Sequence, residues 1–289
     1  MTSKQYVPAM TRAGLAPTHS VEAVDEYGHT RALNIAGERP LTLYIDKKEI
    51  VTLMTLGTQP EALALGYLRN QGLIERLEDI KAVQADWETE SVVVTTYNGV
   101  TGLDERTARR TVTTGCGQGT VFGNLMEKLE RVRLPRTALR QSLIYDLLTN
   151  LNRHNEIYRD AGAVHGCALC RGTDVLMFVE DVGRHNAADA IAGRMWLEGL
   201  DGGDKIFYTT GRLTSEMVIK VAQMGIPVLL SRSGITQMGL DLARKVGVTM
   251  IARAKGTHFL VYNGASEIIF DVQPARRSGG RDDPRAESA

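Results

Sequence analysis

Cysteine is scarce in this sequence, with three residues in a chain of 289. An odd and small number of cysteines argues against a disulfide framework, so we expect a reducing compartment, the cytoplasm. No apolar run approaches the roughly 20 residues that span a bilayer, and the first residues lack the apolar core of a signal peptide. A membrane partner is therefore not expected.

Net charge is missing as well, because 34 lysine and arginine residues balance 34 aspartate and glutamate residues. Without a global field of one sign, the chain has no general attraction to nucleic acid or to a membrane surface. Hydrophobic residues make up 43% of the chain and charged residues 24%, which is typical of a globular protein with a substantial core. The length fits one large domain or two ordinary ones.

Glycine-rich phosphate loops of the two common kinds are absent from the stretch TTGCGQGT, residues 113–120. The stretch has no lysine for a Walker loop, and its G-x-G-x-G spacing differs from the dinucleotide fingerprint G-x-G-x-x-G. It places Cys116 among glycines, which permit positive φ and movement of the backbone. Arginines shortly upstream would favour the reactive thiolate: Arg106, Arg109 and Arg110. The residues alone leave two interpretations open, a reactive thiol or a glycine-rich turn with a small buried cysteine.

The N-terminal half has the pattern of a small α+β domain. Two strand-like segments, residues 41–45 and 50–56, flank a polar turn and predict a hairpin. The sequence TQPE, with Thr58 as the cap and proline in the first turn, predicts a helix that Gly72 ends. The β-branched residues 91–97 predict a further strand.

In the C-terminal half, short apolar segments alternate with helical patterns, which indicates a largely parallel sheet covered on both faces. The expected strands are residues 164–170, 175–180, 205–210, 227–231 and 248–252. The expected helices are residues 137–161 and about 186–200, 214–224 and 236–245. Ligands of such sheets bind beyond the carboxyl ends of the strands, where this sequence places three polar loops: EDVGRHN, TTGRLTSE and SRSGITQ.

Five segments of the sequence together resemble the FdhD family, the sulfurtransferases that serve as formate dehydrogenase accessory proteins. They occur in the family's order between about Ala36 and Tyr262: TTGCGQG, GAVHGCAL, EDVGRHNAADAIAG, TGRLTSEMVIKVAQMGIPVLLSRSG and VTMIARAKGTHFLVY. The resemblance implies homodimers built from a small N-terminal domain and a larger α/β/α domain similar to the cytidine deaminases.

We therefore expect the fold class α/β, with the chain divided into four parts. Residues 1–20 form a disordered tail, and residues 21–135 form a small α+β domain that ends in the cysteine loop. Residues 136–272 form the three-layer α/β/α domain that binds the cofactor. Residues 273–289, rich in charge, glycine and proline, form a second disordered tail.

The resemblance also implies an activity. Family members accept persulfide sulfur from a cysteine desulfurase and deliver it to the molybdenum or tungsten bis-molybdopterin guanine dinucleotide cofactor, which formate dehydrogenase needs to be active. The family's persulfide-bearing cysteine opens a C-G-x-C-G motif, which falls here on Cys116. Its cofactor-binding segment falls on the residues that follow the last expected strand: Arg253, Ala254, Lys255, Gly256, Thr257 and His258.

The sequence departs from the family pattern at three of these places. Gly119 replaces the second cysteine of the loop motif, so no relay between two loop thiols is available. Arg253 stands where an aromatic or apolar residue is common, and His258 stands where an arginine is common.

The candidate residues supply the groups that such chemistry needs. Sulfur transfer needs an accessible thiolate, which Cys116 can supply. Lys255 and Arg253 offer cations for phosphates, and Gly256 permits close approach of the backbone. Arg184 and His185, at a strand-to-helix junction, are weaker candidates. They could line the same pocket, or Arg184 could pair with Glu180 or Asp181.

The remaining cysteines, Cys167 and Cys170, form a C-x-x-C outside the family motif. Buried packing is the first interpretation; a dithiol redox pair and a relay partner for Cys116 are the alternatives. With His165 they suggest zinc, but three ligands within six residues lack the usual distant pair. The deaminase signature H-x-E with a later P-C-x-x-C is missing too, so no metal is expected.

Three functions compete for these residues. A sulfurtransferase would use Cys116, a non-catalytic chaperone would hold the same cofactor without carrying sulfur, and a redox protein would use Cys167 and Cys170.

Overall fold

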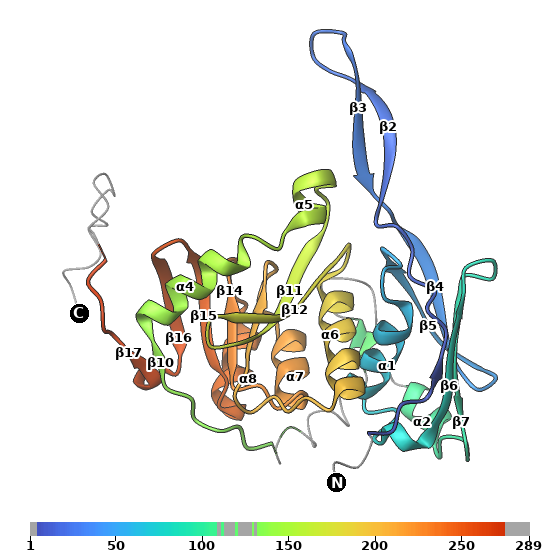
Figure 1. The fold of residues 1–289 in the computed structure, drawn as a ribbon. Coiled ribbons are helices and arrows are strands. Elements are labelled where there is room, and N and C mark those ends of the chain that lie inside the picture. The colour runs from blue at the N-terminus through green and yellow to red at the C-terminus, as the bar shows by residue number, and fades with distance from the viewer. Residues whose placement is uncertain (1–4, 109–110, 113–118, 121–128, 130–131, 275–289) are drawn as a thin grey trace.

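The computed structural model of the chain describes residues 5–108, 111–112, 119–120, 129 and 132–274. Figure 1 shows two larger sheets at opposite sides of the molecule, with helices packed between them. None of the helices in these described ranges combines the length and the apolar character that crossing a membrane requires.

The first sheet has five strands in the order β1-β6-β7-β4-β5. Its strands are β1 (Ala9–Met10), β4 (Arg39–Ile45), β5 (Lys48–Thr55), β6 (Ile80–Asp86) and β7 (Ser91–Thr96). The predicted hairpin is confirmed as β4 and β5, with Asp46 at φ 52° in its turn. The expected helix is α1 (Pro60–Asn70), but Thr58 does not cap it. Its N-cap is Gln59, whose side chain makes no cap hydrogen bond.

The N-terminal segment is ordered from residue 5. The prediction of a disordered tail over residues 1–20 is therefore wrong for residues 5–20. Strand β1 pairs in parallel with β6. Glu61, the last residue of the TQPE sequence, accepts hydrogen bonds from Thr11 Oγ1 at 2.6 Å and from the Ala13 N–H at 2.9 Å. This buried carboxylate holds the segment against the start of α1.

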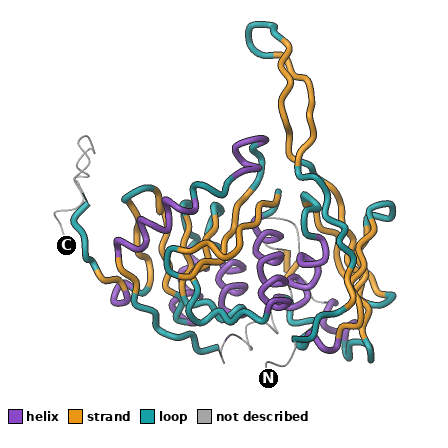
Figure 2. The backbone as a smooth tube through the Cα atoms, in the orientation of Figure 1, coloured by secondary structure: helices purple, strands orange, loops and turns teal. Residues whose placement is uncertain are grey.

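A hairpin that the sequence analysis missed stands off the body of the molecule. It consists of β2 (Thr18–Val24) and β3 (Thr30–Ala36), and it projects beyond both sheets in Figures 1 and 2. Asn34 on β3 donates to both carboxylate oxygens of Asp160 at 3.0 Å. The hairpin therefore joins the body partly through a helix of the second half, α5 (Glu156–Ala161).

The second sheet has six strands in the order β12-β11-β13-β14-β15-β16. Their bounds are β11 (His165–Arg171), β12 (Asp174–Asp181), β13 (Ile206–Thr209), β14 (Val228–Ser231), β15 (Thr249–Lys255) and β16 (His258–Asn263). Only β13, β14 and β15 pair in parallel with one another. The expected largely parallel sheet is thus mixed, because the outer pairs β11–β12 and β15–β16 are antiparallel hairpins without a crossover helix.

Helices cover both faces of this sheet, which confirms the three-layer α/β/α arrangement. Three helices, α6 (Arg184–Glu198), α7 (Ser215–Gln223) and α8 (Gln237–Val246), pack on one face together with inward residues such as Phe207 and Leu229. Helix α4 (Gln141–Leu151) packs on the other face.

The single long helix expected over residues 137–161 is wrong. The chain forms strand β10 (Leu139–Arg140), which pairs with β17 (Ile268–Ile269), then α4, and then α5. The break has a cause in the neighbouring strand. The Glu180 carboxylate at the end of β12 accepts the N–H groups of Ile157 and Tyr158 at 2.9 Å each, which begins a new helix there.

Helices α1 and α6 bring the two sheets together. A Cβ on Gly66 would lie 1.7 Å from the Asp189 carbonyl oxygen, and a Cβ on Gly193 would lie 1.9 Å from the Ala62 carbonyl oxygen. The two helix backbones therefore touch where neither helix has a side chain. One continuous set of buried residues extends from the first sheet through this crossing to α6, α7 and α8.

We predict that Gly66→Ala destabilises the protein strongly. The added methyl group meets backbone atoms that cannot rotate away, and we expect a loss of about 3 kcal/mol in the free energy of unfolding. This exceeds the roughly 1 kcal/mol that alanine gains over glycine within a helix. Urea denaturation measures the change.

Gly234→Ala is the matched control, because a Cβ at Gly234 meets no atom within 4 Å. Its free energy of unfolding should stay within about 0.5 kcal/mol of the wild type. Equal denaturation midpoints for the two variants would contradict the close crossing of α1 and α6.

Candidate functional site

The predicted sulfur-bearing residue, Cys116, lies outside the described residues. The segment that contains it, residues 113–118, is flanked by a short antiparallel pair, β8 (Thr111–Val112) and β9 (Gly119–Thr120). Gly119, the residue that replaces the second motif cysteine, pairs with Val112. The role of Cys116 stays a prediction.

The three polar loops that the sequence places after strands gather at one edge of the second sheet. Strands β13, β14 and β15 are parallel and end there, and backbone hydrogen bonds join the loops at their ends. Leu213 donates to the Gly234 carbonyl at 3.0 Å, and Arg253 donates to the Ser233 carbonyl at 2.9 Å. Thr210 donates to the Gly166 carbonyl of β11 at 2.9 Å. These bonds fix the loops after β13 and β14 relative to each other and to the neighbouring strands β11 and β15.

A cavity of about 490 Å³ opens at this edge. It lies between the strand ends and the α4–α5 segment, and its walls combine two tyrosine side chains, hydroxyl groups and two cations. The lining residues are Leu148, Asn152, Tyr158, Tyr208, Thr210, Arg232, Ser233, Ala254, Lys255 and Gly256.

Half of the predicted cofactor segment lines this cavity. Ala254, Lys255 and Gly256 do so, whereas Arg253, Thr257 and His258 are exposed residues outside the lining. An irregularity in the β15–β16 pairing lies between Ala252 and Lys255, and Arg253 adopts φ 52° within it. The structure thus separates Lys255, which lines the cavity, from Arg253, which does not. Cofactor binding by these six residues stays a prediction.

Positive charge gathers around His165, the first residue of β11. Burial lowers the pKa of His165, and the charges of Arg184, Arg212 and Arg232 lower it further. The imidazole is therefore neutral at pH 7 and lies 3.4 Å from the Thr210 hydroxyl. An edge with several arginines and a neutral histidine favours an anionic ligand.

Arg184 and His185, the weaker candidates, are both buried and are not among the described residues that line the cavity. The imidazole Nε2 of His185 lies 3.1 Å from a carboxylate oxygen of Glu216. Burial, with the charges of Lys220, Arg184 and His165, lowers the pKa of His185 to about 2. His185 is thus a neutral residue between α6 and α7.

Asp181, at the end of β12, is a structural residue that the sequence analysis did not identify. Its carboxylate accepts hydrogen bonds from the Thr55 hydroxyl at 2.5 Å, the Leu56 N–H at 3.2 Å, and the Gly183 N–H at 3.0 Å. Asn186 also donates to it at 2.9 Å. The end of β5 in the first sheet is therefore fastened beside the site edge of the second.

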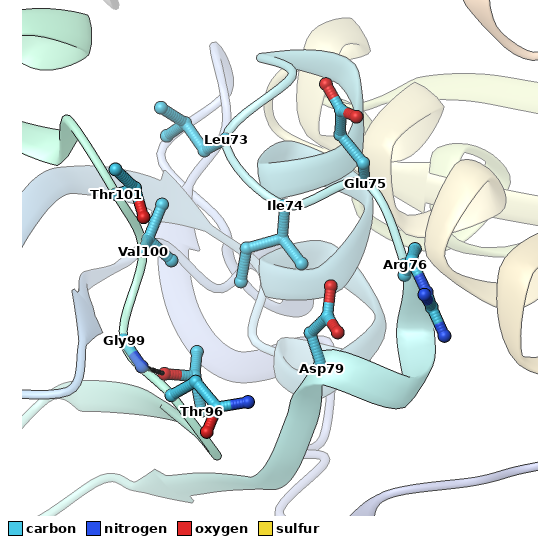
Figure 3. Close-up of a pocket in the computed structure, with 10 residues that line it drawn as sticks. Leu73, Ile74, Glu75, Arg76, Asp79, Thr96, Gly99, Val100 and Thr101 are labelled. Atoms are coloured by element: carbon cyan, nitrogen blue, oxygen red, sulfur yellow. Dashed lines mark hydrogen bonds between the residues drawn. The ribbon is translucent and has the colours of Figure 1, made fainter.

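A second cavity, of about 390 Å³, lies beside the first sheet (Figure 3). Its charged lining side chains carry both signs, and none of the predicted site residues is part of it. In Figure 3 the Gly99 N–H donates to the Thr96 hydroxyl, at 2.9 Å. Its lining residues are Leu73, Ile74, Glu75, Arg76, Asp79, Thr96, Asn98, Gly99, Val100 and Thr101. The first cavity is the better candidate, because it combines predicted residues with a lining whose charged side chains are all cations.

Comparison with known proteins identifies the family. The sequence model of the FdhD/NarQ family matches residues 36–269. The chain belongs to the FdhD/NarQ family. The resemblance drawn from the five sequence segments is confirmed.

Individual relatives match over most of the chain. The chain is 29% identical over 245 residues to the sulfur carrier protein FdhD of Wolinella succinogenes, covering 84% of each protein. It is 30% identical over 237 residues to the sulfur carrier protein FdhD of Bacillus subtilis, covering 80% of this chain and 88% of that protein. A crystal structure from Desulfotalea psychrophila, of a protein assigned as a formate dehydrogenase accessory protein, superposes with a TM-score of 0.69. That protein is 26% identical, and the match covers 87% of this chain and 98% of that one.

Cys167 and Cys170 are buried packing residues in this member of the FdhD/NarQ family, as first expected. Cys167 packs toward α6 to α8 and Cys170 packs toward α4, so the two side chains lie on opposite faces of β11. Residues three apart in a strand are about 10 Å apart, beyond the roughly 7 Å limit for a disulfide. The dithiol redox hypothesis is therefore wrong. Among the described residues, no group of three or more histidine, cysteine or acidic side chains could hold a metal ion.

We predict that both core thiols resist alkylation. Burial raises the pKa of Cys167 to about 12 and that of Cys170 to about 12. At pH 8 their thiolate fraction is then about a thousandfold below that of an ordinary cysteine. In a Cys116→Ala variant, iodoacetamide should leave the folded chain unmodified and should modify both thiols in urea, as measured by mass spectrometry. Modification of the folded chain would contradict the burial.

Proposed function

We propose that this chain is a sulfur carrier in the maturation of formate dehydrogenase. In this proposal Cys116 takes persulfide sulfur from a cysteine desulfurase, and the chain passes it to the molybdenum bis-molybdopterin guanine dinucleotide cofactor before insertion. The names of the relatives support the sulfur-carrier role, and the assignment of the similar crystal structure supports formate dehydrogenase as the client. The observation that carries the proposal is the cationic cavity formed by part of the predicted cofactor segment.

The loading step follows ordinary thiol–disulfide exchange. The Cys116 thiolate attacks the terminal sulfur of the desulfurase persulfide, and a new S–S bond forms on Cys116. The S–S bond of the donor breaks, and the desulfurase cysteine leaves as a thiolate. No net oxidation or reduction occurs, so the rate depends on thiolate fraction, nucleophilicity and access. This makes the chain a sulfurtransferase with a cysteine persulfide intermediate.

The cofactor is the substrate of the second half of the reaction. The cavity volume of about 490 Å³ falls in the usual range for small-molecule sites, about 300–1,000 Å³. We assign it to one guanosine diphosphate arm. Lys255 and Arg232 supply charge for the pyrophosphate, and Gly256, at φ 59° in the β15–β16 turn, lets a ligand approach the backbone.

We also propose that the protein acts as a homodimer in the cytoplasm, in keeping with the family resemblance. A competing function is that of a non-catalytic chaperone, which holds the same cofactor without carrying sulfur. Gly119 favours this alternative, because the family motif has a second cysteine at that position.

Loading of sulfur separates the two functions. Incubation with a cysteine desulfurase and cysteine should add the mass of one sulfur atom to the peptide that contains Cys116, and dithiothreitol should remove it. The Cys167→Ala, Cys170→Ala double variant should load like the wild type, because Cys116 acts alone. Absence of loading, under conditions that load a relative with both loop cysteines, would support the chaperone instead.

Binding of the guanine nucleotide should depend on Lys255 and much less on Arg253. Lys255→Ala should weaken GDP binding about tenfold, because one charge-assisted hydrogen bond to phosphate is lost. The difference in GDP affinity between this variant and the wild type should grow as the salt concentration falls. With less screening, Lys255 of the wild type attracts the phosphates more strongly, and the variant lacks this attraction. Arg253→Ala is the matched control and should change affinity less than about twofold. Isothermal titration calorimetry at two salt concentrations tests both; an unchanged Kd for Lys255→Ala would contradict this assignment of the cavity.

A further inference from the structure

The cavity has one aromatic wall that comes from outside the cofactor segment. Tyr158, on α5, lines the cavity, and the residue is 47% exposed. Tyr208 lines the cavity too, but it is only 2% exposed and offers little ring surface. Tyr158 is therefore the ring that a ligand can cover.

The position of Tyr158 is fixed through its backbone. Glu180 is 6% exposed, and its two carboxylate oxygens accept the N–H groups of Ile157 and Tyr158. At the other end of α5, Asp160 accepts from Asn34 of the projecting hairpin. The helix is thus held to β12 and to β3 at the same time. The backbone that carries the ring is therefore held in place before a ligand binds.

Two cations share the cavity with Tyr158. Arg232 and Lys255 line the cavity from the ends of β14 and β15, and the Arg232 guanidinium carbon lies 5.5 Å from the centre of the Tyr158 ring. The guanidinium lies over the ring, so a face of Tyr158 points toward the cations of the cavity. Phosphate alone would need only the cations, whereas a nucleotide presents both a flat base and phosphates.

We propose that Tyr158 is the base-stacking residue of this cavity. It supplies a stacking surface for a purine base, while Arg232 and Lys255 face the diphosphate. This inference rests on the proposed cofactor site and extends it, because it assigns nucleotide selectivity to α5, an element outside the family's cofactor-binding segment. Base binding exchanges the Arg232 contact on the ring for a stacking contact and leaves the guanidinium for the phosphates.

Two probes test the proposal: GDP and inorganic pyrophosphate. Each is titrated into the full chain and its affinity is measured by calorimetry. Stacking of one base on an aromatic residue contributes about 1–3 kcal/mol, so Tyr158→Ala should weaken GDP binding roughly 5- to 150-fold. Pyrophosphate, which has no base, should bind this variant as it binds the wild type. Tyr158→Phe keeps the ring and should bind GDP within about twofold of the wild type.

Two controls address folding and surface effects. Tyr158→Leu keeps apolar bulk on α5 without a ring, and it should lose GDP affinity while its urea denaturation midpoint stays that of the wild type. Tyr27→Ala removes a 74% exposed tyrosine from the far end of the hairpin and should change neither affinity.

The outcomes separate this inference from the function on which it rests. Wild-type affinity for GDP in Tyr158→Ala or Tyr158→Leu would overturn the stacking role and leave the cofactor site standing. Loss of pyrophosphate binding in the same variants would also overturn it, because Tyr158 would then support the cavity rather than the base. If the wild type binds neither probe, both the stacking role and the cofactor site are contradicted.

Discussion

The structure depends on the close crossing of α1 and α6. Gly66 and Gly193 let the two helix backbones touch, and the buried core continues through the crossing from one sheet to the other. A side chain at either position would separate the helices and with them the sheets. The carboxylate of Asp181 then fastens the end of β5 to the site edge through Thr55 and Leu56. The first sheet is thus held beside the edge of the second sheet at which the cavity opens.

The proposed function uses two parts of the chain, the segment that contains Cys116 and the cavity at the edge of the second sheet. The chain leaves the first sheet after β7 and reaches the segment that contains Cys116, which β8 and β9 flank. The carboxyl edge of the second sheet gathers cations and a nucleotide-sized cavity. In the proposed function, Cys116 accepts the sulfur and the cavity holds the cofactor. The buried thiols of β11 belong to the hydrophobic core.

Features that depend on local pattern could be predicted from the sequence. The β4–β5 hairpin and the strands of the second sheet follow from short apolar runs, and the edge at which the cavity opens follows from strand order. The predictions that are wrong concern segments whose structure depends on a residue far away in the sequence. Glu61 orders the N-terminal segment, and Glu180 divides the expected long helix. The place of Tyr158 in the cavity lining could not be predicted for the same reason, since Glu180 positions its backbone. The irregularity in β15 that separates Arg253 from Lys255 likewise has no signal in the local pattern.

The central claim is that Cys116 carries sulfur for formate dehydrogenase without a second thiol. Formate dehydrogenase activity, measured in a bacterial strain that lacks its own accessory protein, tests it most directly. We predict that the wild type and the Cys167→Ala, Cys170→Ala double variant restore activity, whereas Cys116→Ala, present at equal abundance, does not. Restored activity with Cys116→Ala would contradict the proposed role of Cys116 as the sulfur carrier.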